Sequence, residues 1–259
     1  MKKFISFGGP TSDFHNTLKR ICNEAKHFDY FDEIIGLTEK DLMGDTDFWN
    51  KNKEFILKNS KGYGYWIWKP YLINKELEKM NDGDILVYAD AGCKINKNGK
   101  KRFLEYIEIL NNDKDDYGVI SFQLDYEEYM YTKNKIFEYF NCNDEIKNSY
   151  QFLAGIQIIK KNKHSVELLK RWSETSSNYE LINNNLSENE CAKFRDNRND
   201  QSIFSILVKI YGSIIINDET SFNNVNDEIN YPLLAKRIKY SSERPNGVRR
   251  NIRHRLHFT

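Results

Sequence analysis

The sequence has little of what marks several common classes of protein. Its four cysteines, Cys22, Cys93, Cys142 and Cys191, form no C-x-x-C pair. This spacing suits neither a zinc site nor a disulfide framework, so we expect reduced thiols in a cytosol-like compartment. Lysine plus arginine (39) and aspartate plus glutamate (38) leave a net charge of +1. Such a balance gives no overall attraction to nucleic acid or anionic lipid, and we expect no nucleic-acid partner.

Long apolar runs are also missing. No segment reaches the roughly twenty apolar residues needed to span a bilayer. The apolar run in "MKKFISFGGP" is too short for the core of a signal peptide and is stopped by Gly8, Gly9 and Pro10. We therefore expect a soluble, cytoplasmic protein without a transmembrane segment, and any contact with a membrane would be peripheral.

The signatures of several enzyme classes are absent as well. The sequence contains no G-x-S-x-G, no G-x-x-x-x-G-K-[ST] and no H-E-x-x-H. His15, His27 and His164 show no nucleophile or metal spacing and are interpreted as structural. What is present is a hydrophobic fraction of 39% with 14% aromatic residues. These proportions indicate a folded chain, because disordered chains lack the apolar groups that offset the entropy of ordering.

Short apolar runs alternate with stretches of helical periodicity along the 259 residues. The runs that predict strands are 3–7, 32–37, 85–88, 117–122, 152–159 and 213–217, and the helical stretches are 13–27, 45–57, 70–80, 98–110, 129–139, 164–173 and 199–211. Residues 178–190 are polar and predict a surface loop. Because alternating strands and helices favour a parallel sheet, we expect an α/β fold with a mainly parallel central sheet flanked by helices. No linker divides the chain, so we expect one domain, 1–259, with a basic tail from about residue 232.

The stretch "DGDILVYADAG", Asp82–Gly92, ends a buried strand on a single aspartate, Asp90. In open α/β sheets, ligands bind beyond the carboxyl ends of the strands. For an arbitrary aspartate at such a place, capping of a turn is the usual role. The neighbouring sequence favours a ligand-binding role for Asp90 instead.

"YADAG" resembles the D-x-D region of GT-A glycosyltransferases, in which acidic residues meet the ribose and a divalent metal on the diphosphate of a sugar nucleotide. Two later stretches occur in the same order as in that family. "FLAGIQIIKKN" (152–162) is similar to the family's N-A-G strand, and "NRNDQSIFSIL" (197–207) is similar to its N-D-Q helix start. The resemblance covers about residues 60–215 and implies a GT-A-like fold, with the first strand, ending at Phe7 and Gly8, in the nucleotide-binding half.

The resemblance also implies roles for residues. Asp90, Ala91 and Gly92 would meet the donor, with Asp90 as a ligand of Mn²⁺ or Mg²⁺. Gly92 stands where the family has its second acid. Ala154 and Gly155 would let the donor sugar approach the backbone, although close packing against a helix is an equally good explanation. Asp200 would lie beside the anomeric carbon and Gln201 beside a sugar hydroxyl. The alternative for Asp200 is a helix N-cap, a role that Asn199 can also take.

The stretch "YGYWIWKP" places four aromatic residues just before a predicted helix. Tyr63, Tyr65, Trp66 and Trp68 cannot all be buried without partners for their polar atoms, so we expect some to line a cleft and the others to join the core. Lys69 precedes Pro70 in the first turn of the helix, where anions bind well. In related transferases a basic residue at this place meets the diphosphate, and Lys69 is the candidate here.

The end of the chain is basic. Between positions 236 and 255 it carries Lys236, Arg237, Lys239, Arg244, Arg249, Arg250, Arg253 and Arg255 against one acid, Glu243. By default such a run is a solvated arm or a patch for nucleic acid. In several GT-A families, however, basic tail residues close over the diphosphate and a histidine completes the metal site. The resemblance therefore implies a diphosphate contact for Arg255 and a metal-ligand role for His257.

Together these features predict a glycosyltransferase that moves a sugar from a nucleoside diphosphate donor, expected to be a UDP-sugar, to a hydroxyl of a glycan or glycoconjugate. The relatives that the sequence resembles act on capsular polysaccharides or are viral, which suggests polysaccharide biosynthesis. Two alternatives remain: a sugar-phosphate nucleotidyltransferase, and a non-catalytic module that binds nucleotide sugars or glycans. Loss of the second acid at Gly92 would suit the module.

Overall fold

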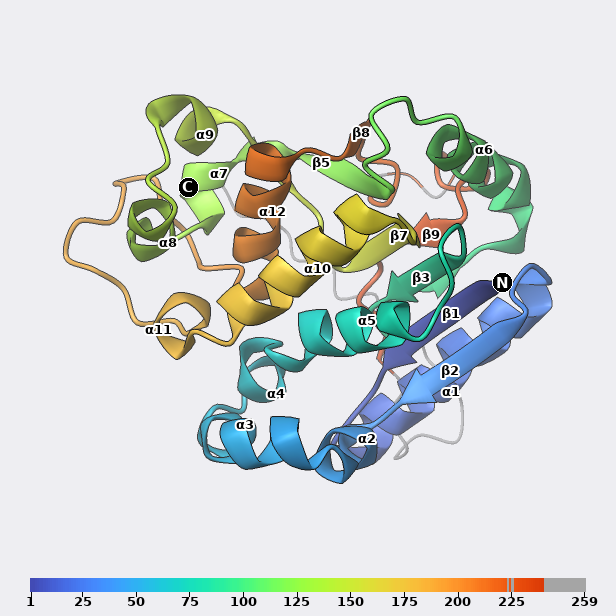
Figure 1. Cartoon of the computed structure of the whole chain (residues 1–259), viewed down its shortest axis with the longest axis horizontal. Helices are drawn as coiled ribbons and strands as arrows, with labels where there is room; N and C mark the ends of the chain where they lie inside the picture. Colours follow the sequence, from blue (N-terminus) through green and yellow to red (C-terminus); the bar gives the residue numbers. More distant parts are fainter. Residues whose placement is uncertain (223, 225, 240–259) are drawn as a thin grey trace.

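The structure of the protein is a computed structural model that describes residues 1–222, 224 and 226–239 (Figure 1). Its centre is a seven-stranded sheet in the order β2-β1-β3-β7-β5-β6, with β8 paired to β5. The strands are β1 (Lys2–Phe7), β2 (Glu33–Leu37), β3 (Ile85–Ala89), β5 (Val119–Glu127), β6 (Tyr150–Phe152), β7 (Ile156–Lys160) and β8 (Ile214–Asn217). A separate antiparallel pair joins β4 (Lys94–Ile95) to β9 (Leu233–Leu234).

Most strands of the central sheet point in one direction. β1 is parallel to β2 and β3, and β5 is parallel to β8. β7 runs antiparallel to both β3 and β5, and β6 runs antiparallel to β5. β1, β2, β3, β5 and β8 therefore share one direction, and only β6 and β7 oppose it. The predicted α/β fold with a mainly parallel sheet is confirmed.

Helices flank both faces of the sheet (Figure 1). They are α1 (Ser12–Phe28), α2 (Glu39–Gly44), α3 (Thr46–Lys58), α4 (Gly62–Tyr65), α5 (Trp68–Glu78), α6 (Lys100–Asn111), α7 (Glu128–Tyr131), α8 (Asn134–Tyr139), α9 (Asp144–Asn148), α10 (Lys163–Ser176), α11 (Tyr179–Ile182) and α12 (Asp200–Tyr211), with a 3₁₀ turn η1 (Lys97–Gly99). Within the described residues, none of these helices combines the length and the apolar character needed to cross a membrane.

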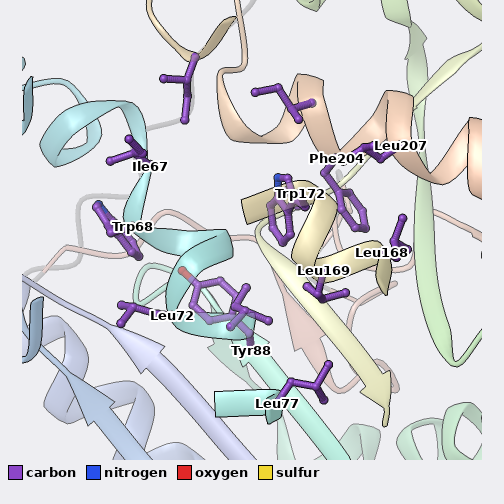
Figure 2. Close-up of a cluster of buried hydrophobic side chains, with 14 of the residues drawn as sticks. Ile67, Trp68, Leu72, Leu77, Tyr88, Leu168, Leu169, Trp172, Phe204 and Leu207 are labelled. Carbon is purple, nitrogen blue, oxygen red and sulfur yellow. The ribbon is translucent and has the colours of Figure 1, made fainter. Parts of the chain in front are cut away.

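Alternating side chains along the strands divide the core into two clusters. Val87 of β3 faces the cluster formed with α1 and α6, while Leu86 and Tyr88 face the cluster formed with α5, α10 and α12. Figure 2 shows the second cluster, which contains Tyr88 together with Trp172 of α10 and Phe204 of α12. This alternation follows from the two-residue period of a strand covered by helices on both faces.

Two predicted elements are divided in the structure. The run 152–159 is not one strand, because the chain leaves β6 after Phe152 and enters β7 at Ile156. The stretch 129–139 is not one helix, because α7 ends at Tyr131 and α8 begins at Asn134. Lys133 between them is fully buried and donates to Asn183, which explains the break, since a continuous helix would carry this side chain elsewhere.

Two other predicted segments contain regular structure. The polar stretch 178–190 includes the short helix α11, whose Leu181 and Ile182 are buried. The predicted tail begins with buried residues, since Leu233 and Leu234 form β9 and pair with β4. This pairing places the described end of the chain beside the loop that follows β3.

Candidate active site

A cleft of about 870 Å³ opens at the carboxyl ends of β1 and β3, the place where ligands bind in open α/β sheets. Most residues predicted for the site line it: Phe7, Gly8, Lys69, Asp90, Ala91, Gly92, Gly155, Asp200 and Gln201. Ala154 is not among the lining residues and is fully buried. Arg255 and His257 lie outside the described residues. The structure thus brings together residues from five separate segments, while their roles remain predictions.

An ion-pair cluster of three residues lies in this cleft. Lys69 Nζ is 3.1 Å from Asp90 Oδ1 and 2.9 Å from Asp200 Oδ2. The Lys69 and Asp200 side chains are each only 4% exposed, whereas that of Asp90 is 36% exposed. Two carboxylates therefore share one buried ammonium, and Asp90 is the most exposed member of the cluster.

Burial and mutual charge shift the proton affinities in this cluster. Burial raises the pKa of Asp200 to about 6, the nearby charge of Asp90 also raises it, and Lys69 opposes both effects. For Lys69, burial works against the charged form, but Asp200 and Asp90 outweigh it and raise the pKa of the ammonium well above its usual value. Lys69 therefore carries a positive charge at neutral pH, and Asp200 titrates much closer to neutrality than an ordinary aspartate.

Lys69 reaches the cleft because the chain makes a left-handed turn just before α5. This turn includes the short element α4. All five residues from Gly62 to Trp66 have positive φ, with values of 59°, 52°, 85°, 54° and 61°. Glycine adopts this conformation freely, but Tyr63, Tyr65 and Trp66 do so at a cost of about 1–2 kcal/mol each. The turn closes when the Lys69 N–H donates to the Trp66 carbonyl oxygen at 2.9 Å. Strain of this kind is concentrated at binding and catalytic sites.

The aromatic stretch contributes both to the cleft and to the core. Tyr63 and Trp66 are half-buried and line the cleft, and Tyr65 is half-buried but not among its lining residues. Trp68 lines the cleft but is 5% exposed, and its ring stacks on Phe7 with centroids 3.9 Å apart. Its indole N–H donates to the Gly62 carbonyl oxygen at 3.0 Å. Tyr63 and Trp66 are therefore the rings that offer a surface for stacking.

Asp90 is held by three interactions, two at its carboxylate and one at its backbone. The Tyr88 hydroxyl donates to Asp90 Oδ1 at 2.6 Å, and Lys69 is the ion-pair partner. The Asp90 N–H donates to the Gly155 carbonyl oxygen at 2.8 Å, across the gap between β6 and β7. A Cβ atom on Gly155 would lie 2.9 Å from Asp90 Oδ2, so only glycine fits there without displacing the carboxylate. The small residue predicted at Gly155 thus makes room for Asp90, not for packing against a helix.

The start of α12 orients Asp200 and Gln201. Asn199 has φ 54°, and its side chain turns toward the preceding loop and donates to the Ile182 carbonyl oxygen at 2.6 Å. Asp200 is the first residue of the helix, so its carboxylate faces Lys69 and does not act as the N-cap. Gln201 Oε1 accepts from the Ala154 N–H at 3.2 Å, and Gln201 Nε2 donates to Gln151 Oε1 at 2.8 Å. These two hydrogen bonds fix the amide of Gln201 at the wall of the cleft.

The loop Asp90–Cys93 is fixed by a helix on one side and by the end of the described chain on the other. Arg20 of α1 donates to the carbonyl oxygens of Ala91 and Cys93, both at 2.5 Å. The Ile238 N–H donates to the Gly92 carbonyl oxygen at 2.8 Å. A Cβ atom on Gly92 would lie 3.2 Å from Arg237 Cα, so backbone packs closely where the family's second acid would begin.

The sequence analysis missed several other residues that line the cleft, among them Asp125, Tyr126, Arg198 and Asp218. Asp125 and Tyr126 lie near the end of β5, and Asp218 directly follows β8. An acid at the end of a strand is the same signal that identified Asp90, and it could have identified Asp125 and Asp218. Arg198 is placed over the ring of Tyr131, 4.4 Å from its centroid, which no local pattern in the sequence indicates.

The described residues of the cleft lack the ligand set of a divalent metal site. Within residues 1–222, 224 and 226–239, no group of three or more His, Cys, Asp or Glu side chains is placed to hold such an ion. Asp90 and Asp200 already share the Lys69 ammonium, and Gly92 supplies no carboxylate. The described residues therefore do not fit the predicted Mn²⁺ or Mg²⁺ site, whose other predicted ligand, His257, lies outside them.

Comparison with known proteins gives similarity in structure only. No family model matches the chain, and no curated protein matches its sequence. A glycosyltransferase involved in the glycosylation of the major capsid of PBCV-1 is 10% identical with a TM-score of 0.47, over 90% of this chain and 92% of that chain. Mouse xyloside xylosyltransferase 1 is 12% identical with a TM-score of 0.46, over 84% and 85%. The galactosyltransferase LgtC, in complex with donor and acceptor sugar analogs, is 14% identical with a TM-score of 0.43, over 90% and 86%.

Proposed function

We propose that the protein is a glycosyltransferase that moves a sugar from a nucleoside diphosphate, with UDP as the first candidate, to a hydroxyl group of a glycan. The observation that carries this proposal is the cluster of Lys69, Asp90 and Asp200 in a cleft at the carboxyl ends of the strands. The volume of about 870 Å³ lies within the usual range for pockets that bind small molecules.

The walls of the cleft offer groups suited to each part of such a donor. The rings of Tyr63 and Trp66 provide faces on which a nucleobase can stack. Asp90 has a partly exposed carboxylate that can accept hydrogen bonds from ribose or sugar hydroxyls. Lys69 supplies a fixed positive charge close to where the diphosphate of a donor contacting Asp90 would lie.

In the proposed reaction the bond between the anomeric carbon and the diphosphate oxygen breaks, and its electron pair stays on the diphosphate. The oxygen of the acceptor hydroxyl forms the new bond to the anomeric carbon, and its proton passes to a base. Asp200 is the candidate for that base because burial and Asp90 bring its pKa to about 6. Lys69 lowers the energy of the departing diphosphate by charge, and Gln201 would orient a sugar hydroxyl through its fixed amide.

The test is incubation of the full chain with a panel of nucleotide sugars and measurement of the released nucleoside diphosphate, with and without glycan acceptors. We expect release from one class of donor, and we expect Asp90→Asn to lower it about a hundredfold. Asp82→Asn is the matched control, because Asp82 is an exposed residue in the turn at the opposite end of β3. Saturable binding of a donor without release under any acceptor would replace the transferase with a non-catalytic binding module.

A further inference from the structure

We propose that Arg237 and Lys239, with the Lys69 ammonium offsetting the carboxylates of Asp90 and Asp200, supply the positive charge that a divalent metal ion would otherwise bring to the donor diphosphate, so that donor binding and transfer do not need a metal. This inference rests on the proposed function and names the charge that serves the same site. It follows from what surrounds Asp90 in the structure.

The carboxylates that would hold a metal ion already have a cation. Lys69 Nζ lies 3.1 Å from Asp90 Oδ1 and 2.9 Å from Asp200 Oδ2. A Mn²⁺ or Mg²⁺ ion bound to Asp90 would stand a little over 2 Å from the same oxygen, and the adjacent ammonium would repel it. Lys69 is 4% exposed and sits at the start of α5, so the side chain has little freedom to move aside.

The surroundings of Lys69 favour a permanent positive charge. Its ammonium lies 5.9 Å from the ring centroids of both Trp66 and Tyr88, in addition to its two ion pairs. The two rings offer their negatively polarised faces to the cation. Lys69 is therefore part of the folded site before any ligand binds, as a resident metal would be.

The space of the missing acid is filled by a segment that carries further positive charge. The Ile238 N–H donates to the Gly92 carbonyl oxygen, and Arg237 Cα would be 3.2 Å from a Cβ on Gly92. Arg237 and Lys239, on either side of Ile238, both line the cleft and are exposed. The D-x-D pattern has a second carboxylate at this place, which binds a metal ion. This chain has Gly92 there instead, with Arg237 and Lys239 nearby.

The positive charges at the site can stabilise the departing diphosphate without a metal ion. Lys69 offsets the charge of the carboxylates that would otherwise repel a diphosphate, and Arg237 and Lys239 can donate charge-assisted hydrogen bonds to its oxygens. When the bond to the anomeric carbon breaks, the electron pair moves onto a diphosphate oxygen. These three cations would stabilise the added negative charge, and no change of oxidation state or additional reactant is required.

The first experiment is calorimetric titration of the full chain with uridine, guanosine, cytidine and adenosine diphosphates, in excess EDTA and in excess Mn²⁺ or Mg²⁺. We expect one nucleotide to bind with dissociation constants that differ by less than about threefold between the two buffers. We also expect release of the diphosphate from the matching nucleotide sugar to continue in EDTA. Binding or release that is lost in EDTA and restored by either metal would overturn the inference while leaving the proposed function intact.

The second experiment measures how much Arg237 and Lys239 contribute to binding of the diphosphate, with a control for general effects of removing a surface charge. Arg237→Ala with Lys239→Ala should weaken binding of the diphosphate about tenfold or more, because each removes a charged donor. Lys170→Ala is the control, since Lys170 is an exposed residue of α10 that pairs with Glu174 across one helical turn. Equal affinity in the wild type and in the double variant would contradict the role of the two tail residues.

Lys69→Met alone would leave the buried carboxylate of Asp200 unpaired, a change that strongly destabilises a folded protein. The role of Lys69 must be tested in a background without that carboxylate. We therefore compare Asp200→Asn with the double variant Lys69→Met and Asp200→Asn, which removes both charges of the buried pair. The double variant should bind the diphosphate at least about tenfold more weakly than Asp200→Asn in EDTA. Equal affinities would overturn the role of Lys69. Failure of every nucleotide to bind in either buffer would instead reject the proposed function, and this inference with it.

Discussion

Lys69 Nζ lies 2.9 Å from Asp200 Oδ2, which joins the first turn of α5 to the first residue of α12 inside the cleft. Both side chains are 4% exposed, so this is a buried ion pair with little screening by water. Removing one partner of such a pair typically costs about 3–5 kcal/mol, because the other charge stays buried. The pair therefore fixes the two helix starts relative to Asp90 and makes stability and charge at the site interdependent.

The raised pKa of Asp200 predicts a specific dependence of stability on pH. Burial and Asp90 raise this pKa from 3.8 to about 6, so the folded state holds the proton more tightly than the unfolded state. The stabilisation that comes from this tighter proton binding is fully present below 3.8, the pKa of Asp200 in the unfolded chain, and is lost as pH rises through about 6, its pKa in the folded chain. Between about pH 5 and about pH 7 the wild type should lose about 1 kcal/mol of unfolding free energy from this group.

Urea unfolding of the wild type and of Asp200→Asn at several pH values measures this effect. The variant cannot titrate at position 200, so the difference in unfolding free energy between the two proteins should shift by about 1 kcal/mol in favour of the wild type at the acidic end. A difference that stays constant over this range would show that Asp200 titrates as an ordinary aspartate.

The left-handed turn before α5 predicts that Trp66 is strained. Its φ of 61° is unfavourable for alanine as well as for tryptophan, but not for glycine. Trp66→Gly should therefore be more stable than Trp66→Ala by about 1 kcal/mol, although glycine ordinarily destabilises a chain relative to alanine. Thermal unfolding of the two variants gives this difference directly, and a more stable alanine variant would contradict the strain.

Trp66 also predicts a change in ligand binding. If a nucleobase stacks on this ring, both Trp66→Gly and Trp66→Ala should weaken binding of the nucleoside diphosphate about tenfold, because stacking contributes about 1–3 kcal/mol per base. Phe14→Ala serves as a comparison from another aromatic residue of the cleft wall. An equal loss in all three variants would point to a general change in the cleft, not to stacking at Trp66.

The order of strands and helices could be predicted from the sequence because it depends on local periodicity. Asp90 was identified for the same reason, since a buried strand that ends on an acid is visible in a few residues. The gap at Gly155 was not predicted, because the pairing of β7 with β3 and β5 and the close approach of Asp90 come from distant segments. A continuous apolar run does not reveal where a strand stops.

Lys69 shows the same limit at the candidate site. The sequence indicated that it lies at a helix start, but its partnership with Asp90 and Asp200 depends on five consecutive residues in a left-handed turn. Gly62 and Gly64 permit that turn, yet Tyr63, Tyr65 and Trp66 adopt it only because tertiary packing compensates their strain. The charge balance of the cleft is therefore a property of the folded chain.

Gly155 predicts a position-specific effect of a single methyl group. In Gly155→Ala the new Cβ would lie 2.9 Å from Asp90 Oδ2, so the carboxylate must move. We expect transfer to fall about tenfold or more, because small displacements of a positioning group are costly. Gly44→Ala is the matched control, since a Cβ there meets no atom within 4 Å. Unchanged transfer rates in Gly155→Ala would show that the position of Asp90 is not critical.

Lys133 predicts an increase of stability at alkaline pH. Its side chain is fully buried and donates to Asn183 O at 2.8 Å, Asn183 Oδ1 at 2.8 Å and Asn185 O at 3.2 Å. Burial, with repulsion by Lys135, lowers its pKa from 10.5 to about 8. The unfolded chain therefore binds this proton more tightly than the folded chain, and stability should rise as pH passes from about 8 toward about 10.5.

The measurement compares the wild type with Lys133→Met, whose side chain is similar in size and does not titrate. From about pH 7 to about pH 9.5 the difference in unfolding free energy should shift by about 2 kcal/mol in favour of the wild type. Lys135→Met, which removes an exposed partner of Glu180, should leave most of this shift in place. Lys133 donates to Asn183, the residue after the Ile182 carbonyl that Asn199 contacts, and so anchors the segment that leads to Asn199 and Asp200. Absence of the shift would mean that the Lys133 ammonium is as well solvated as one on the surface.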